Sequence, residues 1–163
     1  MLNAYIGLGS NLGDRAGNLL MGIQGMLGAG LEVLRLSQIY ETEPVDTFPQ
    51  QVFLNMTAEL RGDSLPPPEE VMARLTSVEQ SLGRTRQVAM GPRSIDLDLL
   101  FYRNETRDTQ FLTLPHPRLH LRRFVLVPLA ELAPQLVHPA INKTITELLE
   151  ALDDHSAVNL WKP

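Results

Sequence analysis

Two aspartates in the second half of the chain have the type and spacing of metal ligands. In Ile95-Asp96-Leu97-Asp98-Leu99 aliphatic and acidic residues alternate, as in a strand with one buried face. Because side chains alternate between the faces of a strand, both carboxylates point to the same side. Such a pair suits Mg²⁺, which keeps several waters and commonly joins one or two carboxylates to substrate phosphates. A bare D-x-D also occurs on the exposed face of ordinary amphipathic strands. The motif alone therefore does not distinguish a metal site from an exposed polar face, and residues elsewhere in the chain are needed to do so.

A second strand places an aromatic ring and an amide on its polar side. Phe53, Asn55 and Thr57 alternate with an apolar face made of Leu54, Met56, Ala58 and Leu60. A ring beside a carboxamide can hold a planar heteroaromatic ligand, because the ring stacks while the amide pairs with ring nitrogens and exocyclic groups. The alternative is that Phe53 packs under the C-terminal part of the chain and that Asn55 is a satisfied core amide.

Arginines surround the aspartate motif although the protein carries a formal net charge of -5. Residues 84–123 contain eight arginines against four acidic residues, a local charge of +4 that predicts binding of a small polyanion. Aromatic residues make up only 6% of the chain, which argues against nucleic acid as the partner. The alternative is a solvated face with weak surface ion pairs and a structural histidine. The candidate phosphate donors are Arg84, Arg86, Arg93, His116 and Arg122.

Several classes of site are excluded by what the sequence lacks. It has no G-x-x-x-x-G-K-[ST] loop, and the stretch from Gly7 to Gly13 misses G-x-G-x-x-G by one position. Zero cysteines exclude disulfides and thiolate metal sites. The first residues lack a basic leader, and the longest apolar stretch, Phe124 to Leu132, is far shorter than a membrane span. We expect a cytoplasmic, soluble monomer without a membrane partner.

The pattern of elements predicts an α+β fold in one domain, residues 1–163. The expected order is strand, helix, strand, strand, helix, strand, which is the ferredoxin-like βαββαβ core, an antiparallel sheet with both helices on one face. The expected ranges are a strand at 4–8, a helix capped by Asp14, a bulged strand at 31–42, a strand at 53–61, a helix at 68–82 and a strand at 94–102. A C-terminal helical appendage should follow, with helices near 125–132 and 144–152. The connections at 43–52 and 83–93 are long for this fold and therefore candidates for function.

Six blocks of the sequence together resemble one enzyme family, the hydroxymethyldihydropterin pyrophosphokinases. They run in order over about residues 3 to 135, and Gly91-Pro92-Arg93-Ser94-Ile95-Asp96-Leu97-Asp98 is the most specific of them. The other blocks are Ala4 to Asp14, Tyr40-Glu41-Thr42-Glu43-Pro44, Phe53-Leu54-Asn55, Leu82-Gly83-Arg84-x-Arg86 and Leu114-Pro115-His116-Pro117. The chain departs from familiar members of that family at Glu43, Met90, Phe111 and Pro117, which bears on loop closure and the outer ATP contacts.

The resemblance implies roles for a set of residues. Asp96 and Asp98 would hold two Mg²⁺ ions that bridge the ATP phosphates, and together with Arg84 and Arg93 they would be the catalytic residues. The pterin would lie between Phe53 and Phe124. It would be read by Asn55 and by backbone groups of Thr42, Glu43, Pro44 and Val45. The residues implied to bind ATP are Glu79, Arg84, Arg86, Arg93, Ile95, Thr113, His116 and Arg122.

The implied reaction moves pyrophosphate from ATP to the hydroxymethyl group of 6-hydroxymethyl-7,8-dihydropterin and releases AMP, a step of folate biosynthesis. Two other readings stay open at this point. The chain could be a catalytically silent module that binds a pterin or a nucleotide. It could also be a metal-dependent nucleotidyl or glycosyl transferase built around D-x-D, although no motif for a second substrate of that kind is visible.

Overall fold

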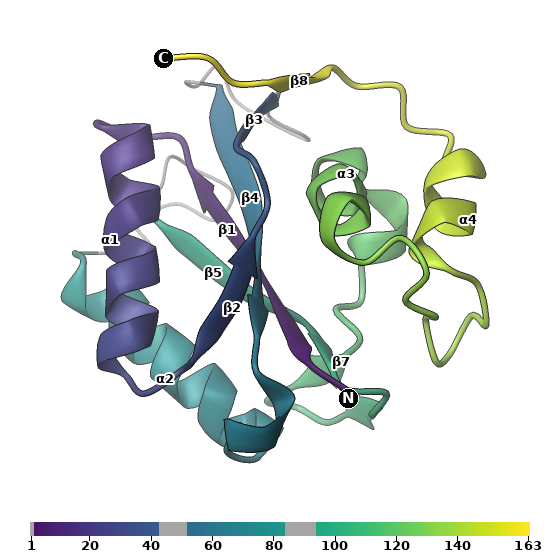
Figure 1. The fold of residues 1–163 in the computed structure, drawn as a ribbon, viewed down its shortest axis with the longest axis horizontal. Helices are drawn as coiled ribbons and strands as arrows, with labels where there is room; N and C mark the ends of the chain where they lie inside the picture. The colour runs from purple at the N-terminus through teal and green to yellow at the C-terminus, as the bar shows by residue number, and fades with distance from the viewer. Residues whose placement is uncertain (1, 43–51, 84–93) are drawn as a thin grey trace.

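The computed structural model describes residues 2–42, 52–83 and 94–163 and contains an antiparallel sheet with helices on both sides (Figure 1). The sheet order is β5-β1-β4-β3-β8, with β2 also paired to β4. Its strands are β1 (Ala4–Ser10), β2 (Val33–Leu36), β3 (Tyr40–Thr42), β4 (Phe53–Leu60), β5 (Asp96–Tyr102) and β8 (Val158–Leu160). The helices are α1 (Arg15–Gly28), α2 (Pro68–Ser81), α3 (Arg123–Leu132) and α4 (Ile145–Glu150). Smaller elements are β6 (Arg107–Asp108), β7 (Thr113–Leu114) and single 3₁₀ turns at Gly62–Ser64 and Leu119–Leu121.

The ferredoxin-like order is confirmed, and α1 and α2 lie together on one side of the sheet (Figure 1). Asp14 caps α1 as its position predicted, because its Oδ1 accepts from the Gly17 backbone N–H at 3.0 Å. Proline at the first position and Glu69 and Glu70 in the first turn favour the start of α2 where it is found. No helix in the described part of the chain is both long and apolar enough to cross a membrane.

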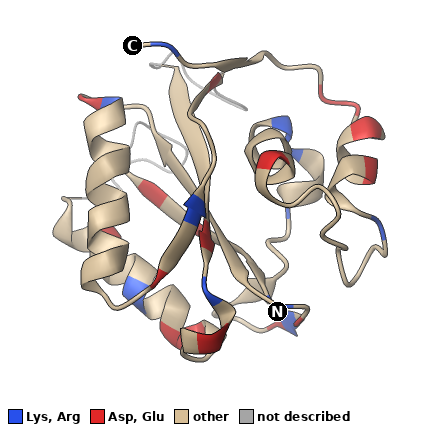
Figure 2. Cartoon of the chain, in the orientation of Figure 1, with Lys and Arg blue, Asp and Glu red and all other residues tan. Residues whose placement is uncertain are grey.

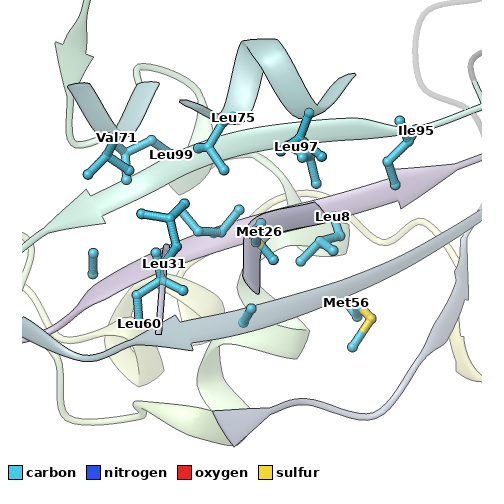
Figure 3. Packing of buried hydrophobic residues seen from close by; sticks show 14 of the residues in the cluster. Leu8, Met26, Leu31, Met56, Leu60, Val71, Leu75, Ile95, Leu97 and Leu99 are labelled. Atoms are coloured by element: carbon cyan, nitrogen blue, oxygen red, sulfur yellow. The ribbon is translucent and has the colours of Figure 1, made fainter. Parts of the chain in front are cut away.

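The core between the sheet and these two helices fixes which way β5 faces. Ile95, Leu97 and Leu99 are at most 2% exposed, and Leu97 and Leu99 lie against Val71 and Leu75 of α2 (Figure 3). Burying one such side chain stabilises the fold by about 1.5–3 kcal/mol. A register slip of one residue would exchange these aliphatic side chains for aspartates, so the pairing of β5 is strongly specified.

A second core on the opposite face of the sheet is built with the C-terminal helices. The register shifts between Tyr5 and Ile6, which inserts one extra residue in β5 and turns both Leu100 and Phe101 toward this face. There they pack with Leu126 and Leu129 of α3. Figure 1 shows α3 and α4 on the side of the sheet away from α1. The C-terminal appendage therefore covers the part of this face that carries Leu100 and Phe101, while Asp96 at the start of β5 remains partly exposed.

The structure differs from the expectation in two elements. The strand expected at 31–42 is two strands, separated at Ser37, whose Oγ accepts from the Thr57 backbone N–H at 2.9 Å. The irregularity expected as a bulge is also present, because the pairing of β2 with β4 shifts register between Val33 and Arg35. The appendage is also more than helical, because β8 returns to the sheet and pairs with β3 through Tyr40 and Leu160.

A buried carboxylate of β4 links β1 and β2 to the C-terminal helix α3. Glu59 of β4 is 5% exposed and accepts from Asn3 Nδ2 at 2.9 Å, from the Tyr5 hydroxyl at 3.0 Å and from Arg35 Nε. Arg35 also donates to the carbonyl of Leu132, the last residue of α3, at 2.8 Å. Burial and the neighbouring Glu59 raise the pKa of Tyr5 to about 12. Figure 2 shows the basic segment of β2 beside the acidic segment of β4.

Replacing Glu59 with alanine should lower the free energy of unfolding by about 2–4 kcal/mol, because the buried Tyr5 hydroxyl and Asn3 amide lose their acceptor and a cavity forms. Urea unfolding measures this loss. The control is Glu32→Ala, which breaks the exposed Arg61–Glu32 pair and should cost less than about 1 kcal/mol. Equal losses in the two variants would contradict the role given to the buried network.

Candidate active site

The register of the sheet brings the predicted metal and ligand residues into one row. Asp96 of β5 pairs with Gly9 of β1, and Gly9 pairs in turn with Asn55 of β4. Directly paired residues of an antiparallel sheet point to the same face, so Asp96 and Asn55 share the face opposite α1 and α2. Two strand spacings separate their backbones, about 10 Å. In the next row on this face, Asp98 pairs with Gly7.

The two aspartates remain partly exposed on this face. The acidic segment at the start of β5 lies at the end of the sheet away from the chain's N-terminus (Figure 2). Carboxylate oxygens are the donors that Mg²⁺ prefers, and two of them leave coordination positions for water and phosphate. The described residues hold no cluster of three or more histidines, cysteines, aspartates and glutamates, so a closed all-protein cage is not formed by them. The donor set thus fits Mg²⁺ shared with a substrate.

Asn55 is fixed at the other end of the row by a buried hydrogen bond. Its Nδ2 donates to the Thr42 hydroxyl at 2.6 Å, and the exposed fractions of the two residues are only 9% and 2%. Phe53, two residues earlier on the same face, is partly buried. Asn55 is therefore in part the satisfied core amide that the sequence allowed as an alternative. Its remaining donor and acceptor capacity is what a ligand would use.

His116 is held as a neutral hydrogen-bond donor beside the aspartates. Its backbone N–H donates to Leu100 O at 2.9 Å, and its Nδ1 accepts from the backbone N–H of Arg118 at 3.3 Å. Because Nδ1 is the acceptor, the neutral ring carries its proton on Nε2. Burial and then the Arg122 charge lower the pKa of His116 to about 4, and Asp96 opposes this shift.

Arg122 and Phe124 stand together where α3 begins. The Arg122 guanidinium carbon lies 5.5 Å from the centre of the Phe124 ring, within the range of a cation–π interaction. Asp154 accepts from the Arg123 backbone N–H at 3.1 Å and so satisfies one of the donors at this helix end. Both Arg122 and Phe124 are partly exposed, and Thr113 of β7, which packs next to β5, is partly exposed as well.

Glu79 has a structural partner that the sequence did not suggest. It is 5% exposed, and its Oε2 accepts from the Leu97 backbone N–H at 2.9 Å. Leu97 lies between the two aspartates on β5, the edge strand whose outward N–H groups need partners. Glu79 therefore holds the backbone that carries the aspartates. Ile95, also implied to contact ATP, buries its side chain in the core, so only its backbone could make that contact.

The remaining predicted site residues lie outside the described part of the chain. They are Glu43, Pro44, Val45, Arg84, Arg86 and Arg93, together with the two long connections that carry them. Their roles stay predictions. Among the described residues, Asp96, Asp98, Asn55 and Thr42 are brought to one face, and the charges of Arg122 and Asp96 act in opposite directions on the pKa of His116.

Sequence reasoning assigned no role to two glycines on this face, Gly7 and Gly9. Both belong to a glycine pattern that fails to match a dinucleotide fingerprint and to the family block from Ala4 to Asp14. Their position was the available signal: glycine inside a strand marks close approach of another group to the backbone. In β1 both glycines alternate with the buried Ile6 and Leu8, so both lie on the face opposite α1 and α2. Gly9 lies beside Asn55, whereas Gly7 lies against Leu100 of the second core.

Comparison with known proteins identifies the family of this chain. Residues 5–134 match the family described as 7,8-dihydro-6-hydroxymethylpterin-pyrophosphokinase (HPPK). The chain belongs to the HPPK family. A 2-amino-4-hydroxy-6-hydroxymethyldihydropteridine pyrophosphokinase of Bacillus subtilis is 41% identical over 98% of this chain and 90% of its own length. One of Synechocystis is 44% identical over 92% of this chain and 76% of its own length.

Solved HPPK structures share the fold. The HPPK portion of an HPPK-DHPS protein, in a crystal structure with substrates, aligns with a TM-score of 0.71 over 93% of this chain at 15% identity. This chain spans 43% of that longer protein. A Plasmodium falciparum HPPK-DHPS structure aligns with a TM-score of 0.69 over 92% of this chain and 45% of its own length. At such low identity these likenesses establish the α+β fold alone.

Titration of His116 should report its environment directly. Its pKa is lowered, so protonation favours the unfolded chain. Its contribution to stability is therefore complete above the ordinary value of about 6.5 and is lost as the pH falls toward about 4. In metal-free protein we expect the ring proton signal of His116 to titrate near pH 4 by NMR, with His116→Gln used to assign it. A midpoint near 6.5 would contradict the described burial.

Proposed function

We propose that this chain transfers the pyrophosphoryl group of ATP to the hydroxymethyl oxygen of 6-hydroxymethyl-7,8-dihydropterin, in folate biosynthesis, with Mg²⁺ as the metal. Membership of the HPPK family supports the reaction, and one observation about the site carries the rest. The row formed by Asp96, Gly9 and Asn55 puts a carboxylate and a buried amide on one face with about 10 Å between their backbones, and Asp98 lies in the next row. This separation is the scale of a ligand whose ring meets Asn55 and whose reacting end meets a phosphate.

The pterin end of the site would be built on β3 and β4. Asn55, oriented by Thr42, would pair with the polar edge of the ring, while Phe53 and Phe124 would stack on its two faces. The Arg122 guanidinium already lies over the Phe124 ring, which restricts the positions of both side chains. A ring held in this way brings its hydroxymethyl group to a fixed place, and positioning of this kind supplies much of the rate of a bimolecular transfer.

The phosphate end would be built on β5 and the segment before α3. Asp96 and Asp98 would hold Mg²⁺, which neutralises charge on the phosphate oxygens when it is bound. Glu79 keeps the backbone between the two carboxylates in place. His116 would donate its Nε2 proton to a phosphate oxygen, and Arg122 would add positive charge nearby. Arg84, Arg86 and Arg93, outside the described residues, are proposed to complete the binding of the phosphates.

In the proposed reaction the hydroxymethyl oxygen attacks the β-phosphorus of ATP in line with the leaving group. A bond forms between that oxygen and the β-phosphorus, and the bond from the β-phosphorus to the bridging α–β oxygen breaks. The bridging oxygen leaves on AMP, and the hydroxyl proton is lost to solvent or to a phosphate oxygen. Transfers of this type need little covalent chemistry from the protein, so no general base is assigned.

We further propose that the protein works as a monomer in the cytoplasm.

The products of ATP test the proposed reaction. We expect AMP to form only when ATP, Mg²⁺ and 6-hydroxymethyl-7,8-dihydropterin are all present, because the β-phosphorus is the atom attacked. Chromatography of the nucleotides, with controls that omit each component, makes the measurement. Formation of ADP would mean transfer of a single phosphoryl group, and binding without turnover would favour a silent pterin or nucleotide module. Release of free pyrophosphate from ATP would favour the nucleotidyl transferase alternative.

Replacing Asp98 with alanine should reduce kcat by about a hundredfold or more while the fold is kept, because a partly exposed strand carboxylate binds metal without supporting the core. Turnover and urea unfolding are measured on the same preparation. Asp63→Ala, at an exposed position of the first 3₁₀ turn, is the control and should keep both properties. A folded Asp98→Ala variant with full activity would refute the metal assignment.

A further inference from the structure

Gly9 of β1 approaches a side chain more closely than any other residue type would allow. A Cβ atom added at Gly9 would lie 2.8 Å from Asn55 Oδ1, a distance that real Cβ atoms essentially never show. The backbone itself does not require glycine there, since Gly9 is not among the glycines with positive φ. Glycine is therefore required at position 9 for a steric reason: the amide of Asn55 occupies the space that a Cβ atom would need.

Asn55 is consequently held from two directions. Its Nδ2 is bonded to Thr42 Oγ1 at 2.6 Å, and its Oδ1 lies against the backbone of Gly9. Thr42 takes one of the two Nδ2 hydrogens, so the amide can still offer an N–H donor beside an oxygen acceptor. An adjacent donor and acceptor complement the amide-like edge of a pterin ring. A shift of the amide by a few tenths of an ångström would spoil both the bond to Thr42 and this match.

We propose that Gly9 is a positioning residue that determines pterin affinity by admitting the Asn55 amide against β1. This inference rests on the proposed function. Among the described residues, the only close contact of the added Cβ is the end of the Asn55 side chain; the next atoms, Asn55 Cγ and the Leu54 carbonyl oxygen, are both 3.8 Å away. Alanine at position 9 should therefore displace Asn55 and leave the pairing of β1 intact.

Gly7 provides a matched control on the same strand and the same face. A Cβ atom at Gly7 would lie 3.5 Å from the side chain of Leu100, an ordinary van der Waals contact. Gly7→Ala makes the same chemical change as Gly9→Ala, one strand repeat away, without touching Asn55. A general effect of alanine on β1 would appear in both variants, whereas the proposed effect belongs to position 9 alone.

The test is a double-mutant cycle of Gly9→Ala and Asn55→Ala, with Gly7→Ala as the control. The Michaelis constants for pterin and ATP, kcat, pterin binding by calorimetry and urea unfolding are measured for each variant. Losing one well-placed hydrogen bond corresponds to an effect of roughly tenfold. We expect Gly9→Ala to raise the KM and Kd for pterin by about that factor, with kcat and the KM for ATP changed less than about twofold.

The cycle separates this role from a structural one. In the Asn55→Ala background the side chain that would clash is gone, so adding Gly9→Ala should change pterin affinity by less than about twofold. Independent, additive effects of the two substitutions, or equal losses in Gly9→Ala and Gly7→Ala, would overturn the proposal. A wild-type protein that binds the pterin but releases no AMP would contradict the proposed function alone. Failure of the wild type to bind the pterin would overturn both.

Discussion

The antiparallel pairing of β1 with β5 on one side and β4 on the other is the constraint on which the rest of the structure depends. Side chains alternate on each strand, so burying Ile6 and Leu8 against the helices sends Gly7 and Gly9 to the opposite face. The same pairing puts Asp96 and Asn55 on either side of Gly9. Because a slip of one residue would bury the aspartates, the core that stabilises the fold also sets the geometry of the site.

The opposite face of the sheet is divided between packing and function. Where β5 carries its extra residue, Leu100 and Phe101 turn toward α3 and form the second core. The network of Glu59 and Arg35 reaches the last residue of α3 and fastens that helix to β2 and β4. The beginning of α3 carries Arg122 and Phe124, so the same contacts that stabilise the C-terminal part hold these two side chains near the site.

The protonation state of His116 is set by its burial and by the charged groups around it. The neutral state of His116 is favoured because burial and Arg122 both oppose its protonation, while Asp96 alone among its named neighbours favours the charged ring. A neutral ring with its proton on Nε2 can donate to a phosphate without repelling Arg122. The candidate site therefore contains a hydrogen-bond donor, His116 Nε2, together with carboxylates that suit a cation. Transfer of a phosphoryl-type group uses both kinds of residue, because the donor and a cation held by the carboxylates can each offset the negative charge of the phosphates.

Much of the site could be predicted because its signals are local. The alternation of apolar and acidic residues around Asp96 and Asp98 predicts which side chains share a face of β5. The proline and acidic residues at the start of α2 predict its first turn, because they favour helix initiation within that turn. The six sequence blocks that resemble the HPPK family added the prediction of the reaction. The division of the strand at 31–42 could not be predicted, because it depends on Ser37 bonding to Thr57, twenty residues away.

The sequence by itself determined the βαββαβ order of the core, the faces of β4 and β5 and the family, since each depends on residue type and short spacing. Only the tertiary structure decided the partners: Glu79 with the backbone of Leu97, β8 with β3, and Gly9 with the amide of Asn55. These contacts join residues from 18 to more than a hundred positions apart. Long-range contacts form only when the whole sheet closes around its core, so no local pattern encodes them.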